Sequence, residues 1–334
     1  MRRIDKFLTT IWIAAAVLSA TVACSNNKSY PEIPGGFGEA GPVLANGNHA
    51  SLSPDGRYLA FHSMKGDTTQ NLYVLDLDSG SERRLYHDET MHAQEPRWSP
   101  DGKSVAFVGG PNYDLGSFSL FTVKANGTDL RKLTTGHNGL LKSPGWSPDG
   151  TRISFAVRNP AELTAHTFSV RAGGDGVLRH TEREGMHQHP RWNPITGQLL
   201  ISYRQMTEDQ QLIGDLYLIE AGETREDGQR LTHTESPEFM MAWSPDARLV
   251  LNVQFVPDSG QYNIFGLDPA TGAEINLSDS PEVNEFFPEF SPDCRFVYHD
   301  NHPKGEGREK GIVRRAVHID TILKRINHQN PSTK

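Results

Sequence analysis

Signatures of common enzyme classes are missing from this chain of 334 residues. It contains no Gly-x-Ser-x-Gly segment, which argues against a hydrolase with a serine nucleophile elbow. It also lacks a P-loop, and it has no Gly-rich turn set between a strand and a helix in the way that dinucleotide binding requires. The motifs alone therefore indicate neither a hydrolytic nor a nucleotide-dependent activity.

Cysteine is scarce, with only Cys24 and Cys294 in the chain. Cys24 ends an apolar stretch, residues 7–23, which follows Arg2, Arg3 and Lys6. This pattern is typical of a secretory signal peptide. The junction Thr-Val-Ala-Cys at residues 21–24 resembles a bacterial lipoprotein processing site, and an ordinary signal peptide followed by an incidental cysteine is the alternative.

The lipoprotein resemblance implies a lipid on Cys24, and Ser25 after it implies the outer membrane. We therefore expect a signal peptide over residues 1–23 and a lipidated Cys24 at the start of a flexible tether over residues 24–42, which is rich in Asn, Gly and Pro. The protein would face the periplasm. A lipidated Cys24 would leave Cys294 without an intramolecular disulfide partner.

Long basic runs are also missing. The full chain has 33 Lys and Arg against 41 Asp and Glu. Removal of residues 1–23 takes away three basic residues and one acidic residue, which leaves 30 against 40, or −10. An acidic surface argues against nucleic acid and against polyanions in general.

One short phrase recurs six times in the rest of the chain. The copies read LSPDG (52–56), WSPDG (98–102), WSPDG (146–150), WNPIT (192–196), WSPDA (243–247) and FSPDC (290–294). Their prolines are 46, 48, 46, 51 and 47 residues apart. A repeat of this length that contains strands is typical of a β-propeller.

Each phrase predicts a hairpin turn, because Pro, Asp and Gly suit its successive positions. The strands that follow, such as residues 105–108, are apolar on both faces, as a strand covered on both sides must be. Third and fourth strands recur as well. We therefore predict an all-β fold, a six-bladed β-propeller of four-stranded antiparallel blades over residues 43–328, with a disordered tail over 329–334.

Two features of the blades stay open at this point. The last blade would take its fourth strand either from residues 322–326 or from the stretch around Val43 and Leu44. Four tryptophans, Trp98, Trp146, Trp192 and Trp243, precede the repeated prolines by two residues. They could form an aromatic platform for carbohydrate, but a position repeated in every blade favours a wedge between blades.

These repeats resemble those of the TolB propeller family, in the W-S-P-D-G phrase and in the strands that follow it. The resemblance covers all six units and implies a rigid disc whose channel mouth or face binds a protein or a glycan. TolB proteins carry a further α/β domain before the propeller, which has no counterpart here, so that domain's role does not transfer.

Histidines and carboxylates recur near the starts of the first strands. His187 and His189 are two residues apart, and on an extended strand they would point to the same side and could share a metal with Glu184. Other first strands contribute His92, Glu95, His137, Glu238 and Glu285, and His49 occupies the same place as His189. In a propeller these residues would converge near one mouth of the channel.

This cluster resembles that of oligogalacturonate lyases, which bind a divalent metal through a His-x-His pair. The resemblance implies His187 and His189 as ligands, Glu184 as a third ligand, and Mn or Ca as the metal. It implies that Arg97 and Arg191 grip uronate carboxylates or assist β-elimination. Those lyases have seven blades, however, and no base is identified in this chain. The alternative is that these histidines make ordinary local hydrogen bonds.

The sequence thus favours a lipid-anchored, non-catalytic module that binds or scaffolds an envelope protein or cell-wall oligosaccharide and contacts the membrane only through its anchor. The expected binding residues are His92, Glu95, His187, His189, Glu238 and Glu285. A metal-dependent polysaccharide lyase is the alternative.

Overall fold

The computed structural model describes residues 33–111, 118–134, 139–159, 161–182, 184–209, 212–220, 228–234, 236–278, 281–305 and 310–329. Blade 1 contains β2 (Asn48–Leu52), β3 (Tyr58–Ser63), β4 (Asn71–Asp76) and β5 (Glu82–Tyr86). Blade 2 contains β6 (His92–Trp98), β7 (Ser104–Gly110), β8 (Ser119–Lys124) and β9 (Arg131–Lys132). Blade 3 contains β10 (Leu140–Trp146), β11 (Arg152–Asn159), β12 (Thr164–Arg171) and β13 (Leu178–Arg179).

The remaining blades follow the same order. Blade 4 contains β14 (Met186–Trp192), β15 (Leu199–Met206), β16 (Leu212–Ile219) and β17 (Gln229–Arg230). Blade 5 contains β18 (Glu238–Trp243), β19 (Val250–Val256), β20 (Gln261–Leu267) and β21 (Glu274–Asn276). Blade 6 contains β22 (Val283–Phe290), β23 (Phe296–Pro303), β24 (Gly311–Ala316) and β1 (Gly41–Ala45).

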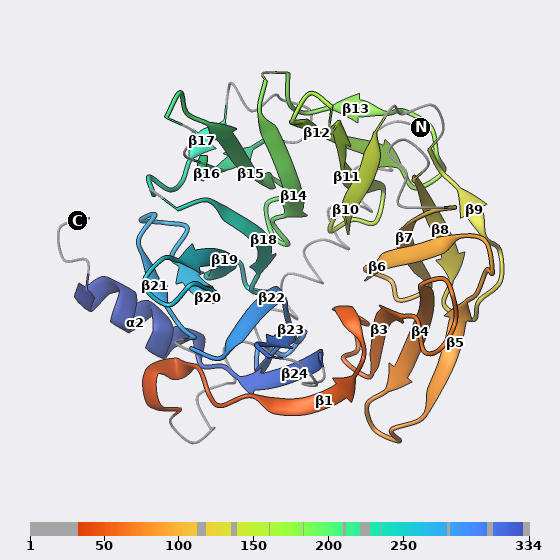
Figure 1. Ribbon diagram of the computed structural model, residues 1–334, viewed down its shortest axis with the longest axis horizontal. Coiled ribbons are helices and arrows are strands. Elements are labelled where there is room, and N and C mark those ends of the chain that lie inside the picture. Colours follow the sequence, from red (N-terminus) through yellow and green to blue (C-terminus); the bar gives the residue numbers. More distant parts are fainter. Residues whose placement is uncertain are drawn as a thin grey trace, which may run out of the picture.

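The six units are arranged in a ring, with β6, β10, β14, β18 and β22 toward its centre (Figure 1). Four of the units are separate four-stranded sheets. Blades 3 and 4 form one eight-stranded sheet because a single residue pair, Ala165 with Met186, bridges β12 and β14. The predicted propeller of four-stranded antiparallel blades is therefore confirmed.

The repeated phrase closes the first hairpin of each blade. In five turns the Ser hydroxyl donates to the Asp carboxylate two residues later, at 2.5–2.7 Å. The Gly position is left-handed, with φ near 68° in Gly102 and Gly150, and Ala247 and Cys294 adopt the same conformation with φ of 57° and 59°. The repeated aspartates are thus explained by turn chemistry.

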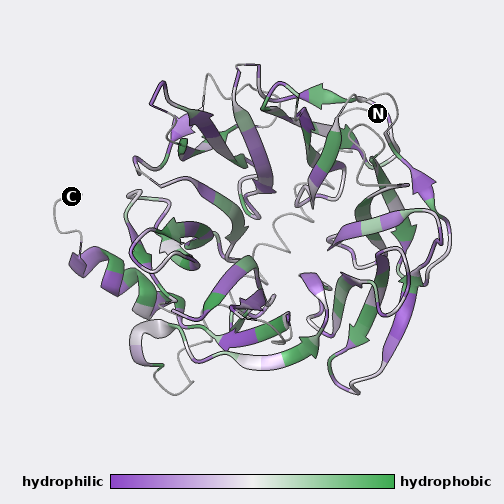
Figure 2. Cartoon of the chain, viewed as in Figure 1, coloured by the Kyte–Doolittle hydropathy of each residue, from purple (hydrophilic) through white to green (hydrophobic). Residues whose placement is uncertain are grey.

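Burial follows strand position within each blade. Strand β4 is buried along almost its whole length, whereas three of the five residues of β5 are exposed. Figure 2 shows the same contrast, because β5 is largely hydrophilic. Stacked neighbours cover the inner and middle strands on both faces, and this explains their apolar sequences.

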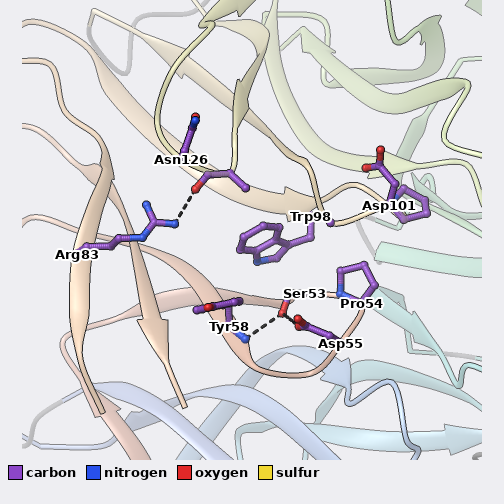
Figure 3. Close-up of a pocket in the computed structure, with 11 residues that line it drawn as sticks. Ser53, Pro54, Asp55, Tyr58, Arg83, Trp98, Asp101 and Asn126 are labelled. Atoms are coloured by element: carbon purple, nitrogen blue, oxygen red, sulfur yellow. Dashed lines mark hydrogen bonds between the residues drawn. The ribbon is translucent and has the colours of Figure 1, made fainter. Parts of the chain in front are cut away.

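The tryptophans lie between blades. Trp98 and Trp192 are each only 8% exposed. The Trp146 indole N–H donates to the Arg97 carbonyl of blade 2 at 3.1 Å, and that of Trp192 donates to Gly145 of blade 3 at 3.1 Å. In Figure 3 the Trp98 indole faces Tyr58 and Ser53 of blade 1, along a groove between blades 1 and 2. The prediction of an inter-blade wedge is confirmed.

The ring closes through β1, one of the two alternatives left open by the sequence. Strand β1 pairs antiparallel with β24 and completes blade 6 from the N-terminal side. Residues 322–326, the other alternative, belong instead to helix α2 (Ile319–Gln329). Three isoleucines of α2 (Ile319, Ile322 and Ile326) are buried in a core cluster with residues of blades 5 and 6. The 3.6-residue spacing of these apolar side chains suits a helix, which explains the difference.

The stretch expected as a tether is partly packed against α2. The short helix η2 (Pro34–Gly36) contacts α2, and the Arg325 guanidinium donates to the Gly35 carbonyl at 2.6 Å. Strand β1 begins at Gly41, two residues before the predicted start of the propeller. The predicted signal peptide, Cys24, most of the tether, His137 and residues 330–334 lie outside the described residues.

Cys294 is fully buried and disulfide-bonded. This differs from the expectation that it lacks an intramolecular partner, which followed from a lipid on Cys24. Among the described residues, no helix is long and apolar enough to cross a membrane.

Candidate functional site

Every inner strand carries a β-bulge five residues before the repeated proline. The register with the second strand of the blade shifts there in all six blades. The residue at this position has a φ of 53–58° in each blade, although none is glycine: His49, Glu95, Ser143, His189, Met240 and Phe287. All six line one pocket of about 680 Å³. We call this pocket the histidine mouth.

A second pocket, of about 600 Å³, lies toward the other ends of the inner strands. Its lining includes the four repeated tryptophans, so we call it the tryptophan mouth. Arg97, Arg191 and Glu289, each three residues before a repeated proline, also line it. The Arg97 Nη1 lies 3.6 Å from the Glu289 carboxylate. Arg191 is partly buried at this mouth, and this burial, together with the nearby charge of Arg97, lowers its pKa to about 9.

The structure does not bring the three predicted metal ligands together. His187 is fully buried between blades 3 and 4, with its ring 6.0 Å from that of His166 and 4.8 Å from that of Tyr203, whereas His189 lines the histidine mouth. The bulge at His189 explains the difference, because it breaks the strict alternation of side chains on an extended strand. Glu184 is exposed before β14 begins. Among the described residues, no three His, Cys, Asp or Glu side chains are grouped so that they could hold a metal ion.

The other predicted binding residues are divided between the mouth and the blades. Glu95 lines the histidine mouth, where its carboxylate accepts from the Ser143 N–H at 2.7 Å. Glu238 and Glu285 are fully buried: the Thr232 hydroxyl donates to Glu238, and Arg315 pairs with Glu285 at 2.6 Å. His92 accepts from the Gln70 N–H at 3.2 Å and is absent from the lining of both mouths. The structure therefore brings together only Glu95 and His189 of the predicted set, with His49.

Burial holds the histidines of this mouth neutral. It lowers the pKa of His189 well below 6.5, and nearby Arg204, Arg191, Arg97 and Lys142 lower it further. The pKa of His49 is likewise lowered, chiefly by burial. Asp300 accepts from the His49 N–H through both carboxylate oxygens at 3.0 Å, and its burial raises its pKa to about 8.

The sequence did not lead us to three cationic side chains that line the histidine mouth: Lys142, Arg158 and Arg204. They are far apart in the chain, so they form no basic run. Arg158 and Arg204, however, each lie ten residues after a repeated proline. An alignment of the six repeats would have placed them at the same end of neighbouring blades.

Comparison with known proteins supports the fold. Residues 45–184 match the family model described as the TolB beta propeller domain. The dipeptidyl-peptidase 5 of Porphyromonas endodontalis is 29% identical over 285 residues, which are 79% of this chain and 38% of that protein. The chain thus spans well under half of the length of this curated relative.

Two solved structures illustrate the range of similar propellers. TolB from Acinetobacter baumannii superposes with a TM-score of 0.57 at 17% identity, over 74% of this chain and 57% of that one. An oligogalacturonate lyase in complex with manganese gives a TM-score of 0.59 at 14% identity, over 80% and 76% of the two chains. At these identities the likeness concerns the fold alone.

Proposed function

We propose that this chain, which carries a TolB-type propeller, is a non-catalytic binding module of the bacterial envelope. The histidine mouth is the observation that carries the proposal. Hydrogen-bonded blades hold six side chains of five different types around one pocket, at a position fixed by the same bulge in every blade. Loops and strand ends on a rigid scaffold are common binding surfaces.

A capture experiment tests this role. The tagged protein, incubated with envelope extract and cross-linked, is expected to retain one discrete protein or cell-wall fragment. Phe287→Ala combined with His189→Ala should abolish the retention, because both side chains line the mouth. Arg171→Ala is the matched control, since Arg171 is exposed at the end of β12. Retention that is unchanged in the double variant would remove the mouth from the proposal.

Export and lipid attachment form the second part of the proposal. They are supported by the apolar stretch of residues 7–23 and by the junction at Cys24. The structure has Cys294 in a disulfide, and a lipid on Cys24 would exclude an intramolecular disulfide, because the chain has two cysteines. Mass spectrometry of the protein from membranes decides between the two states, and the anchor predicts an acyl chain on Cys24. An intramolecular disulfide in that protein would contradict the anchor.

The competing function is β-elimination on uronate oligosaccharides, favoured by Arg97 and Arg191 in the channel and by the similarity to a lyase propeller. The His-x-His pair does not point to one place, because His187 is buried between blades 3 and 4 while His189 lines the histidine mouth. We therefore place the lyase second. Divalent metal that copurifies in stoichiometric amount, with new ultraviolet absorbance on oligogalacturonate, would reverse this order.

A further inference from the structure

The histidine mouth has two chemically distinct walls. Arg158 and Arg204, on the second strands of blades 3 and 4, form one wall together with Lys142. Aromatic side chains of blades 5 and 6 form the other: the rings of Phe239, Phe255 and Phe286 lie 5.2–5.6 Å from the ring of Tyr262. The walls meet where the Arg204 guanidinium lies 5.5 Å from the Phe239 ring centroid.

The basic wall is not neutralised by the described residues. Lys142 pairs with Glu95 at 3.3 Å, but no described carboxylate forms an ion pair with Arg158 or Arg204. Their Nε atoms are buried and have no hydrogen-bond acceptor. The two guanidinium groups also repel each other, and burial followed by this repulsion lowers the pKa of Arg204. Arg191 and Arg97 of the tryptophan mouth act on His189 as further positive charges, although Arg97 also pairs with Glu289 at 3.6 Å.

A ligand oxyanion would relieve this imbalance. Planar guanidinium groups bind carboxylates through paired, charge-assisted hydrogen bonds. Such hydrogen bonds are stronger where water is partly excluded, because a lower effective dielectric constant weakens the attraction of opposite charges less. The histidine mouth is partly buried and therefore meets this condition. The protein as a whole is acidic, so these cations concentrate positive potential at one place on an otherwise repulsive surface.

We propose that the histidine mouth binds the terminal carboxylate of a peptide chain that ends in an apolar residue. Arg158 and Arg204 would hold the carboxylate, and the aromatic wall would receive the last side chain. This inference rests on the proposed binding function and specifies its ligand. The inner strands of all six blades contribute to the mouth, so it surrounds the centre of the ring, where a chain end can enter.

The aromatic wall favours an apolar body over a sugar acid. A uronate presents several hydroxyl groups, and each needs a hydrogen-bond partner once water is removed. The wall offers phenyl rings, Met240 and Leu212, with Tyr262 as its one hydroxyl. Phe255 is 39% exposed, and covering it would add apolar burial to the binding free energy.

The test measures fluorescence anisotropy of the full protein with a labelled tetrapeptide, Ala-Ala-Leu-Phe, as the free acid and as the C-terminal amide. We expect the acid to bind at least tenfold more tightly, and Arg158→Gln and Arg204→Gln each to weaken it tenfold or more. Phe255→Ser should weaken acid and amide equally. Arg171→Gln, a control on an exposed arginine of blade 3, should change neither affinity by more than twofold.

Equal affinity for acid and amide, or no binding of either, would overturn the inference. So would trigalacturonate binding that depends on Arg204 when the peptide acid does not bind, because the occupant would then be a sugar acid. If the peptides do not bind but retention of the envelope partner still requires His189 and Phe287, only the identity of the ligand is wrong. If retention also does not require these two residues, the proposed binding function is wrong.

Discussion

At the scale of single residues, the main feature of this molecule is a left-handed backbone conformation at residues other than glycine. Six such residues aim side chains into the histidine mouth, and two more, Ala247 and Cys294, stand in the turn position where other blades have Gly. The repeat made the position of each of these residues predictable. The bulge was not predictable, because no residue type marks it: His, Glu, Ser, Met and Phe all occupy it.

Replacement of Ala247 by Gly should stabilise the protein. A side chain in the left-handed region costs about 1–2 kcal/mol, and the greater freedom of glycine in the unfolded chain offsets about 0.5–1 kcal/mol of the gain. The net increase in the free energy of unfolding should be up to about 1 kcal/mol by urea denaturation. Gly150→Ala, at the equivalent turn with φ 68°, should lose a similar amount. A loss of stability in Ala247→Gly would show that the turn is not strained.

The buried Asp300 should make stability fall as pH rises. Its folded pKa is about 8 against an ordinary 3.8, so the folded protein keeps a proton that the unfolded chain releases above about pH 4. The stabilising effect of that proton is complete below pH 4 and is lost between about pH 4 and 8. Asp300→Asn keeps an acceptor for the His49 N–H and removes the titration.

Urea denaturation of both proteins at pH 5, 6.5 and 8 measures this effect. The variant should gain stability relative to the parent by more than about 1 kcal/mol over this range, since one pKa unit corresponds to about 1.4 kcal/mol. The buried histidines titrate alike in both proteins and cancel in the difference. Parallel stability profiles would mean that Asp300 does not titrate in this way.

At the scale of elements, the closure of the ring joins the two ends of the propeller. Strand β1 pairs with β24 from Gly41 to Ala45, and Val43 and Leu44 pack on the core of blade 1. The sequence predicted the strands well wherever the turn phrase set their register. It failed at residues 322–326, where no phrase follows and the apolar spacing suits a helix.

Loss of β1 should therefore destabilise the whole ring. A chain beginning at residue 46 should be less stable than one beginning at residue 33 by about 2–4 kcal/mol, because the burial of a Val or Leu side chain contributes about 1.5–3 kcal/mol. Denaturation in urea, followed by circular dichroism, measures the difference. Equal stability of the two chains would mean that blade 6 does not need its N-terminal strand.

At the scale of the whole molecule, positively charged side chains gather at the centre of the ring although the net charge of the chain is negative. The chain carries a net charge of −8, yet the two mouths are lined, beside Glu95 and Glu289, by five cations from blades 2, 3 and 4: Arg97, Lys142, Arg158, Arg191 and Arg204. The negative net charge predicted that the protein binds anions poorly, and this prediction still applies to its outer surface. Net charge alone could not reveal cationic side chains that come together only when the ring closes.

The most direct measurement of the central claim is photo-cross-linking in living cells from single positions on the two mouths. With p-benzoylphenylalanine in place of Met240, at the histidine mouth, one discrete adduct should form, and Arg204→Gln in the same chain should abolish it. The same substitution at Asp293, at the tryptophan mouth, should give none. An adduct from position 293 with none from position 240 would contradict the account.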